Sequence, residues 1–158
     1  MSAAQPGSGD DQRVGLQPVL AADFEALATI RIAAMRESLE RVGRFDPARA
    51  RDRLRQSFTP EHTQWILLDG EKIGFYTLQP APEGLCLDHL YVLPVFQNRG
   101  LGGLVLQRLI AQADEQALSI KVGALKESAS NRFYQRHGFT KSGEGEWDVY
   151  YLRPGRTR

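Results

Sequence analysis

The sequence has very little cysteine and no long apolar stretch. Its single cysteine, Cys86, excludes an internal disulfide and a metal site built on paired thiolates, and it is typical of a reducing compartment. Apolar residues never run together for the roughly 18 positions that a membrane-spanning helix requires. The opening residues, 1–13, lack the basic and apolar regions of a signal peptide, and we expect a flexible tail there. These features predict a cytoplasmic protein with no membrane partner and no metal.

The chain also lacks an excess of charge of either sign. Its 20 basic and 19 acidic side chains give a formal net charge of +1, which offers no electrostatic basis for nucleic acid as the main partner. Hydrophobic residues make up 42% of the chain and charged residues 25%, the balance of a globular protein rather than a disordered one. A chain of this size can bury most of its surface around one core, so we expect residues 14–158 to form a single domain.

Hydrophobic periodicity divides the chain into strands and helices in the order β-α-α-β-β-β-α-β-α-β-β. Period-two segments predict strands at residues 14–20, 63–68, 72–78, 85–93, 118–125, 139–142 and 147–153. Helical spacing and capping residues predict helices at 23–42, 46–58, 100–117 and 128–137. This order indicates an α/β protein with a mixed sheet.

A glycine-rich segment, residues 97–103, joins the fourth expected strand to the third expected helix. A strand that runs through glycines into a helix N-terminus presents unpaired N–H groups and about half a positive charge to an anion such as phosphate. The dinucleotide-binding fingerprint is excluded because Val105 stands where its third glycine belongs. The P-loop is excluded because Gly102-Gly103-Leu104 offers no Gly-Lys-Ser/Thr.

Two segments together resemble the GNAT superfamily of acetyl-CoA-dependent N-acetyltransferases. The acyl-CoA loop of that family, Gln/Arg-x-x-Gly-x-Gly/Ala, reads Gln97-Asn98-Arg99-Gly100-Leu101-Gly102 here. A later family helix carries Asn-x-x-Ala/Phe-x-x-Phe-Tyr-x-x-x-Gly-Phe or close variants, and this sequence has Asn131 before Phe133-Tyr134 and Gly138-Phe139. The resemblance covers residues 14–153, and residues 35–47 resemble an uncharacterised bacterial group. It implies a mixed, mostly antiparallel central sheet of about seven strands flanked by about four helices.

The resemblance also implies where acetyl-CoA is held and how its thiolate leaves. The strand residues Leu90, Tyr91 and Val92 would contact the pantetheine arm, and Asn131 would contact the pantetheine or the phosphates. The pyrophosphate would lie on the loop residues Gln97, Asn98, Arg99, Gly100, Leu101, Gly102 and Gly103. Tyr134 would contact the cofactor and act as general acid to the thiolate, although packing beside Phe133 also explains a tyrosine there.

The general base and the acceptor site remain open between alternatives. Regular alternation along the strand places Asp88 on the same face as Val92 and His89 on the opposite face. Asp88 matches the position where the family carries a carboxylate or imidazole near the amine, so it is the candidate base. A water relayed to Glu37 or Glu40 is the other candidate. The acceptor is expected to be a small-molecule or peptide amine, and its candidate contacts on the first helix are Arg36, Glu37, Glu40 and Arg41.

An enzyme is not the only function that these residues allow. A non-catalytic acyl-CoA-binding sensor or partner module would keep the same fold and loop, and an acyl group longer than acetyl would use the same donor site. The chain is expected to be a monomer or a homodimer. An interface would use the aromatic residues Trp147, Tyr150 and Tyr151, which core packing explains equally well.

Overall fold

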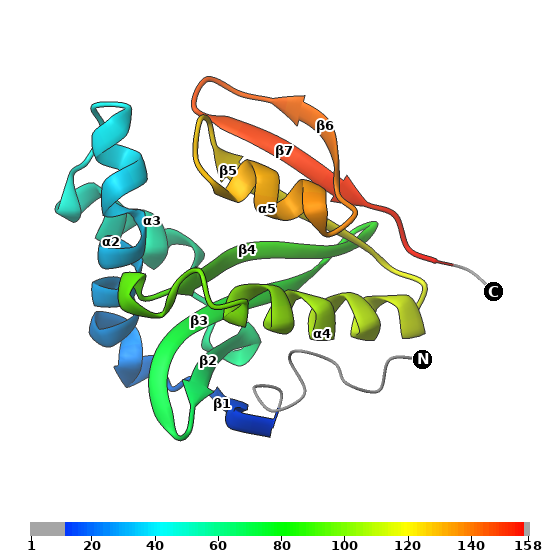
Figure 1. Cartoon of the computed structure of the whole chain (residues 1–158), viewed down its shortest axis with the longest axis horizontal. Coiled ribbons are helices and arrows are strands. Elements are labelled where there is room, and N and C mark those ends of the chain that lie inside the picture. Colours follow the sequence, from blue (N-terminus) through cyan, green and yellow to red (C-terminus); the bar gives the residue numbers. More distant parts are fainter. Residues whose placement is uncertain (1–11, 157–158) are drawn as a thin grey trace.

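The computed structural model describes residues 12–156, and one seven-stranded sheet organises them (Figure 1). Residues 1–11 of the expected tail and the last two residues of the expected domain lie outside this range. The sheet order is β1-β2-β3-β4-β5-β7-β6, and all neighbours are antiparallel except β4 and β5. The strands are β1 Val14–Pro18, β2 Thr63–Leu68, β3 Glu71–Ala81, β4 Gly84–Val92, β5 Ser119–Leu125, β6 Thr140–Glu144 and β7 Asp148–Arg153. The mixed, mostly antiparallel sheet is confirmed.

Four α-helices flank this sheet in the described residues: α2 Phe24–Arg41, α3 Pro47–Ser57, α4 Leu101–Glu115 and α5 Ser130–Arg136. α3 begins at Pro47 because the Asp46 carboxylate accepts the Arg49 N–H at 3.2 Å, and proline suits the first helical position. The β2–β3 turn forms at Asp69 and Gly70, both with positive φ, as a two-residue hairpin turn requires. Local sequence therefore sets both boundaries.

The helices cover opposite faces of the sheet and enclose two apolar cores. α4 and α5 pack on one face, around Leu106, Leu109 and Phe139. α2 and α3 pack on the other face, where Leu27 and Leu54 are fully buried. Each fully buried leucine or phenylalanine of this kind contributes about 1.5–3 kcal/mol to folding. A cleft that passes through the sheet would therefore open toward the α4–α5 layer at one end and toward the α2–α3 layer at the other.

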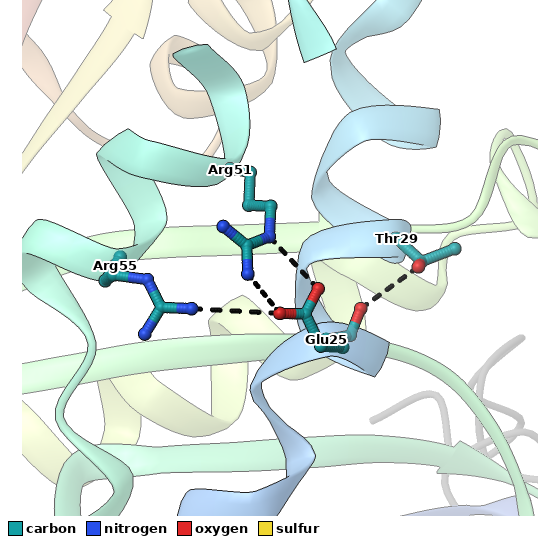
Figure 2. Close-up of polar contacts among 4 residues, drawn as sticks. All are labelled: Glu25, Thr29, Arg51 and Arg55. Carbon is teal, nitrogen blue, oxygen red and sulfur yellow. Dashed lines mark hydrogen bonds and ion pairs between the residues drawn. The ribbon is translucent and has the colours of Figure 1, made fainter. Parts of the chain in front are cut away.

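A charged cluster between α3 and the start of α2 ties the two helices together (Figure 2). The Glu25 carboxylate forms an ion pair with Arg51 and a second, longer one with Arg55 at 3.7 Å. Both guanidinium groups also lie over the Phe24 ring, at 5.3 and 4.1 Å from its centroid. These contacts hold α3 through the side that carries Arg51 and Arg55, and they do not involve its opposite side.

The alternation of side chains between the two faces of the sheet is interrupted in β4 at Asp88. Thr77 of β3 pairs with His89 and Leu78 pairs with Leu87, so Asp88 has no partner in the ladder and forms a β-bulge. The Asp88 carboxylate accepts hydrogen bonds from Cys86 and Gln79. Its neighbour Leu87 belongs to the core on the α4 side, as does Val92, so Asp88 faces the α2 side and does not share a face with Val92 as expected. His89 reaches Ser57 of α3 on that same side. The expectation that Asp88 and His89 lie on opposite faces is therefore wrong, because one extra residue shifts the alternation.

Candidate active site

A cleft of about 1130 Å³ opens where β4 and β5 stop pairing. The parallel ladder joins only Gly84 to Leu87 of β4 with Ser119 to Val122 of β5. Beyond it, residues 88–92 and 123–125 line the cleft from its two sides. Residues of α5 close one end, and residues of α2 and α3 close the other. A ligand in this cleft would lie between separated strand edges rather than on the protein surface.

The free edge of β4 presents backbone polar groups to the cleft. The Leu93 N–H donates to the Ile73 carbonyl of β3 at 2.8 Å. Because neighbouring residues of a strand turn their polar groups to opposite edges, those of Leu90 and Val92 point toward the β5 side. The Val92 carbonyl accepts a hydrogen bond from the Gln97 amide at 2.8 Å, which ties the following loop to this edge. Leu90, Tyr91, Val92 and Gln97 all line the cleft, where they were expected to contact a cofactor.

The loop after β4 leads from Gln97, which lines the cleft, to the N-terminus of α4. The other loop residues expected to hold the cofactor, residues 98–103, are not among those that line the cleft. Gly100 caps the helix with φ +78°, and its carbonyl accepts the Leu104 N–H at 3.0 Å. The N–H groups of Leu101, Gly102 and Gly103 precede the first helical hydrogen bond and have no acceptor within the helix. The N-cap residue is Gly100, so within residues 12–156 no N-cap side chain accepts from them. Three free amides at the positive end of a helix form a cradle for an oxyanion such as a phosphate.

Two other loop features follow from close packing. A Cβ on Gly103 would lie 3.1 Å from His137 Nε2, so glycine lets α4 approach α5. The Arg99 guanidinium lies 5.3 Å from the centre of the Phe96 ring, at an exposed position next to the cradle. Asn98 has a positive φ of 63°. The backbone conformation of the loop is therefore set by Asn98 and Gly100 and its packing by Gly103.

Tyr134 lies at the α5 end of the cleft and is 5% exposed. Its ring packs against Phe133 and Phe139, with centroids 5.2 and 5.5 Å away. Burial raises the pKa of its phenol well above the usual value, with a further contribution from nearby Tyr91. The phenol is therefore protonated at neutral pH and able to donate a hydrogen bond. Packing and an acidic role are compatible at this residue.

Asn131 has a structural part in the same helix. Its amide donates to the carbonyls of Leu125 and Ser128 at 3.0 and 2.9 Å, and its Oδ1 accepts from the Tyr151 hydroxyl at 2.7 Å. Asn131 is not among the residues that line the cleft. It stands three positions before Tyr134, whereas the family pattern separates the two by seven. Its expected contact with the cofactor stays a prediction without geometric support.

Asp88 lines the cleft and is half-buried at the bulge. Its Oδ1 accepts a hydrogen bond from the Cys86 thiol at 3.1 Å, and Gln79 binds its other oxygen. Burial, with Asp88 as a second cause, raises the pKa of the Cys86 thiol to about 12. Cys86 is therefore a neutral thiol at physiological pH and a poor nucleophile, whereas Asp88 is an oriented carboxylate.

A buried polar network at the α2–α3 end was not predicted. His89 is 7% exposed, and its ring nitrogens contact the Ser57 hydroxyl at 2.7 Å and the Tyr91 hydroxyl at 3.0 Å. Burial and then the charge of Arg31 lower the pKa of His89 to about 4, so its ring is neutral at pH 7. Arg31, also 7% exposed, donates to the Tyr91 hydroxyl at 3.1 Å and to the Ala50 carbonyl at 2.7 Å. The sequence feature that could have identified Arg31 as a buried residue is its position on the apolar stripe of α2, four residues after Leu27.

The four charged residues expected to contact the acceptor lie elsewhere on α2. Arg36 pairs with Glu40 at 3.0 Å, and Arg41 pairs with Glu37 at 3.2 Å, each one helical turn apart. None of them lines the cleft, whose α2 residues are Arg31, Ala34, Met35 and Ser38. The α2 side chains that line the cleft are therefore not the charged side chains that were expected to contact the acceptor.

Within residues 12–156, no group of three or more His, Cys, Asp or Glu side chains is placed to hold a metal ion. Nor does any helix of the described chain combine the length and the apolarity needed to cross a membrane.

Comparison with known proteins places the fold. A family model described as the acetyltransferase (GNAT) domain matches residues 60–141, just over half of the chain. The [ribosomal protein bS18]-alanine N-acetyltransferase of Haemophilus influenzae is 31% identical over 97 residues, which are 59% of this chain and 63% of that relative. The match thus spans less than two thirds of the relative's length.

Solved structures agree in fold along nearly the whole chain. PaiA N-acetyltransferase from Thermoplasma acidophilum, in complex with coenzyme A, has a TM-score of 0.73 at 14% identity and covers 89% of this chain and 98% of its own. The ribosomal-protein-S18-alanine N-acetyltransferase of Escherichia coli has a TM-score of 0.68 at 16% identity, covering 92% and 96%. Because the family model matches more than half of the chain and the solved structures share its fold, the chain belongs to the GNAT acetyltransferase family.

Proposed function

We propose that this protein transfers an acetyl group from acetyl-CoA to a primary amine. The observation that carries the proposal is the cleft itself. It joins the free backbone edge of β4, the loop that leads into the α4 cradle, the buried phenol of Tyr134 and the carboxylate of Asp88. A cleft that is connected through Gln97 to the α4 cradle and is lined by polar groups suits a reaction between two bound substrates.

The residues present fit coenzyme A. The free N–H groups of Leu101, Gly102 and Gly103 would bind its pyrophosphate, with Arg99 beside them. The polar groups of Leu90 and Val92 would pair with its amide-containing arm along the β4 edge. When bound, this cosubstrate supplies the activated thioester carbonyl. A PaiA structure of the same fold is described as a complex with coenzyme A, which supports this assignment.

Two side chains of the cleft would move the protons of the reaction. The Asp88 carboxylate would take the proton from the attacking amine, because it is held at the bulge by Cys86 and Gln79. The Tyr134 hydroxyl would give its proton to the sulfur as the carbon–sulfur bond breaks, and water would then return a proton to it. The Tyr134 phenol is protonated at neutral pH and therefore has a proton to give, although its raised pKa makes it a weaker acid than an exposed tyrosine. A relay through Glu37 or Glu40 is less well supported, since neither lines the cleft.

The acceptor is a primary amine of a small molecule or a peptide. The names of the Haemophilus influenzae and Escherichia coli enzymes give an alanine of a ribosomal protein as the group that they acetylate. These names support an amine acceptor for this chain. They leave open whether it is part of a protein.

Release of free thiol from acetyl-CoA across a panel of amines tests the proposal. Tyr134→Phe is expected to lower kcat roughly ten- to a thousand-fold because it removes the general acid. Tyr76→Phe is the matched control, since Tyr76 is similarly buried, at 7% exposure, but lies outside the cleft. Equal kcat for Tyr134→Phe and the unmodified protein would remove the acid role. Acetyl-CoA binding without thiol release on any amine would instead identify a non-catalytic binding module.

A further inference from the structure

Arg31 is a buried cation without a buried counter-ion. Its side chain donates to two neutral groups, the Tyr91 hydroxyl and the Ala50 carbonyl, and the neighbouring His89 is neutral. Within residues 12–156, no carboxylate lies within ion-pair distance of Arg31. An uncompensated buried charge is strongly destabilising, so proteins seldom keep one without a use for it. Arg31 lines the cleft at its α2–α3 end.

α3 adds two more guanidinium groups to this end. Arg49 and Arg53, one helical turn apart, both line the cleft and have no ion-pair partner in the described part of the chain. Arg51 and Arg55 occupy the other side of α3, where Glu25 neutralises them (Figure 2). The helix therefore separates its arginines into a pair neutralised by Glu25 and a pair that faces the cleft without an ion-pair partner in the described residues, although Arg49 also donates to the Arg44 carbonyl at 3.0 Å. We refer to Arg31, Arg49 and Arg53 as the arginine cluster.

The surroundings of the arginine cluster leave it positively charged. The cleft lining holds the three carboxyl groups of Asp52, Asp88 and Asp148, of which α3 contributes Asp52, against the three guanidinium groups and the ammonium group of Lys121, so the basic groups are in excess by one. A smaller cavity of about 70 Å³ adjoins the cleft and is lined by the same three arginines together with Arg44. Its acids are Asp46, which caps α3, and Asp148. A space of this size exceeds the roughly 30 Å³ of a water molecule and accommodates a carboxylate.

We propose that the arginine cluster binds a carboxylate of the acceptor, so that the acceptor is an amine that also carries a negative charge. The planar guanidinium fork matches a carboxylate in two parallel hydrogen bonds. The cluster stands across the sheet from the α4 cradle, and thus at the end of the cleft where the second substrate would enter. The carboxylate is that of a free amino acid or of an acidic side chain near a peptide N-terminus. This inference rests on the proposed acetyltransferase function.

Paired acceptors that differ in one carboxylate test it on the full-length protein. Alanine against alaninamide tests the free amino acid, and C-terminally amidated Ala-Glu-Ala against Ala-Gln-Ala tests the peptide side chain. In one pair, kcat/KM for the acid is expected to exceed that for the amide about 10- to 100-fold, mostly through KM. The pair that shows the preference identifies the source of the carboxylate.

Variants then assign the preference to the cluster. Arg53→Gln is expected to lower the acid-to-amide ratio about three- to tenfold and Arg31→Lys to lower it further, with the KM for acetyl-CoA unchanged. Arg55→Gln, on the other side of α3, is the matched control and keeps the ratio. Equal kcat/KM within both pairs would overturn the inference, as would a ratio that neither Arg53→Gln nor Arg31→Lys lowers.

A binding measurement separates failure of this inference from failure of the proposed function. If no amine releases thiol although acetyl-CoA raises the melting temperature, the acetyltransferase function fails. Calorimetric titration with N-acetylalanine and N-acetylalaninamide, in the presence of coenzyme A, then decides on the arginine cluster alone. Tighter binding of the acid that is lost in Arg53→Gln supports the carboxylate site. Equal binding of the two compounds, or binding of neither, contradicts it.

Discussion

Acidification from pH 7 to pH 5 is expected to destabilise the folded protein through His89. The folded chain keeps this imidazole neutral, because burial and the nearby Arg31 charge lower its pKa from 6.5 to about 4. The unfolded chain binds a proton near pH 6.5, so it holds more protons than the folded chain between pH 4 and 6.5. The contribution of His89 to stability is therefore complete above pH 6.5 and is lost as the pH falls toward 4.

The two pKa values determine the size of the effect. A full shift of this kind corresponds to about 3.4 kcal/mol in the free energy of unfolding, reached only below pH 4. At pH 5 the unfolded imidazole is nearly all protonated while the folded one is not, which gives a loss of about 2 kcal/mol relative to pH 8. With a urea dependence of about 2 kcal/mol per molar, the unfolding midpoint would fall by about 1 M.

Urea unfolding at pH 7 and pH 5, for the unmodified protein and His89→Gln, measures this loss. His89→Gln removes the titration, so its change in free energy between the two pH values is expected to be smaller by about 2 kcal/mol. His137→Gln serves as the control: burial also lowers the pKa of this histidine, but it is more exposed and should contribute less. Identical pH dependence of His89→Gln and the unmodified protein would refute the assignment of a buried neutral imidazole.

Two further substitutions test the layers on either side of the sheet. Leu54→Ala is expected to lower the free energy of unfolding by about 3 kcal/mol in urea titrations, because Leu54 is fully buried and holds α3 against the sheet; a loss below about 1 kcal/mol would show that α3 is loosely packed. Gly102→Glu is expected to abolish the rise in melting temperature that acetyl-CoA causes, worth about 2.7 kcal/mol at a hundredfold excess over Kd. The protein without ligand should keep its stability, since a Cβ at Gly102 meets the Phe133 ring at an ordinary 3.7 Å and an acid suits a helix N-terminus; an undiminished shift would place the pyrophosphate elsewhere.

Features that depend on neighbouring residues were predictable from the sequence. The Asp46-Pro47 helix start, the Asp69-Gly70 turn and the Gly100 cap each rest on backbone preferences of one or two residues. Hydrophobic periodicity then places the strands and helices within a few residues of their observed ends. The two motifs, read together, were enough for the family.

Features that depend on tertiary packing were not predictable from the sequence. The bulge at Asp88 has no signature in β4 alone, because it arises from the register that β3 imposes. The acceptor candidates were chosen for visible charge on α2, whereas the residue that faces the cleft is Arg31, inside the apolar stripe. Asn131 was assigned to the cofactor by its motif, but its amide holds the turn between β5 and α5.

The bulge in β4 also determines how this strand would align with a regular strand that has no bulge. A strand that gains one residue in its middle is out of phase with an unbulged counterpart on one side of the insertion. An alignment that forbids gaps inside strands would then match inward-facing residues to outward-facing ones along half of β4, next to the proposed catalytic carboxylate. Deletion of Asp88, rather than its substitution, would bring the two halves of the strand into a single phase. Such a deletion would turn the cleft residues of one half toward the opposite core.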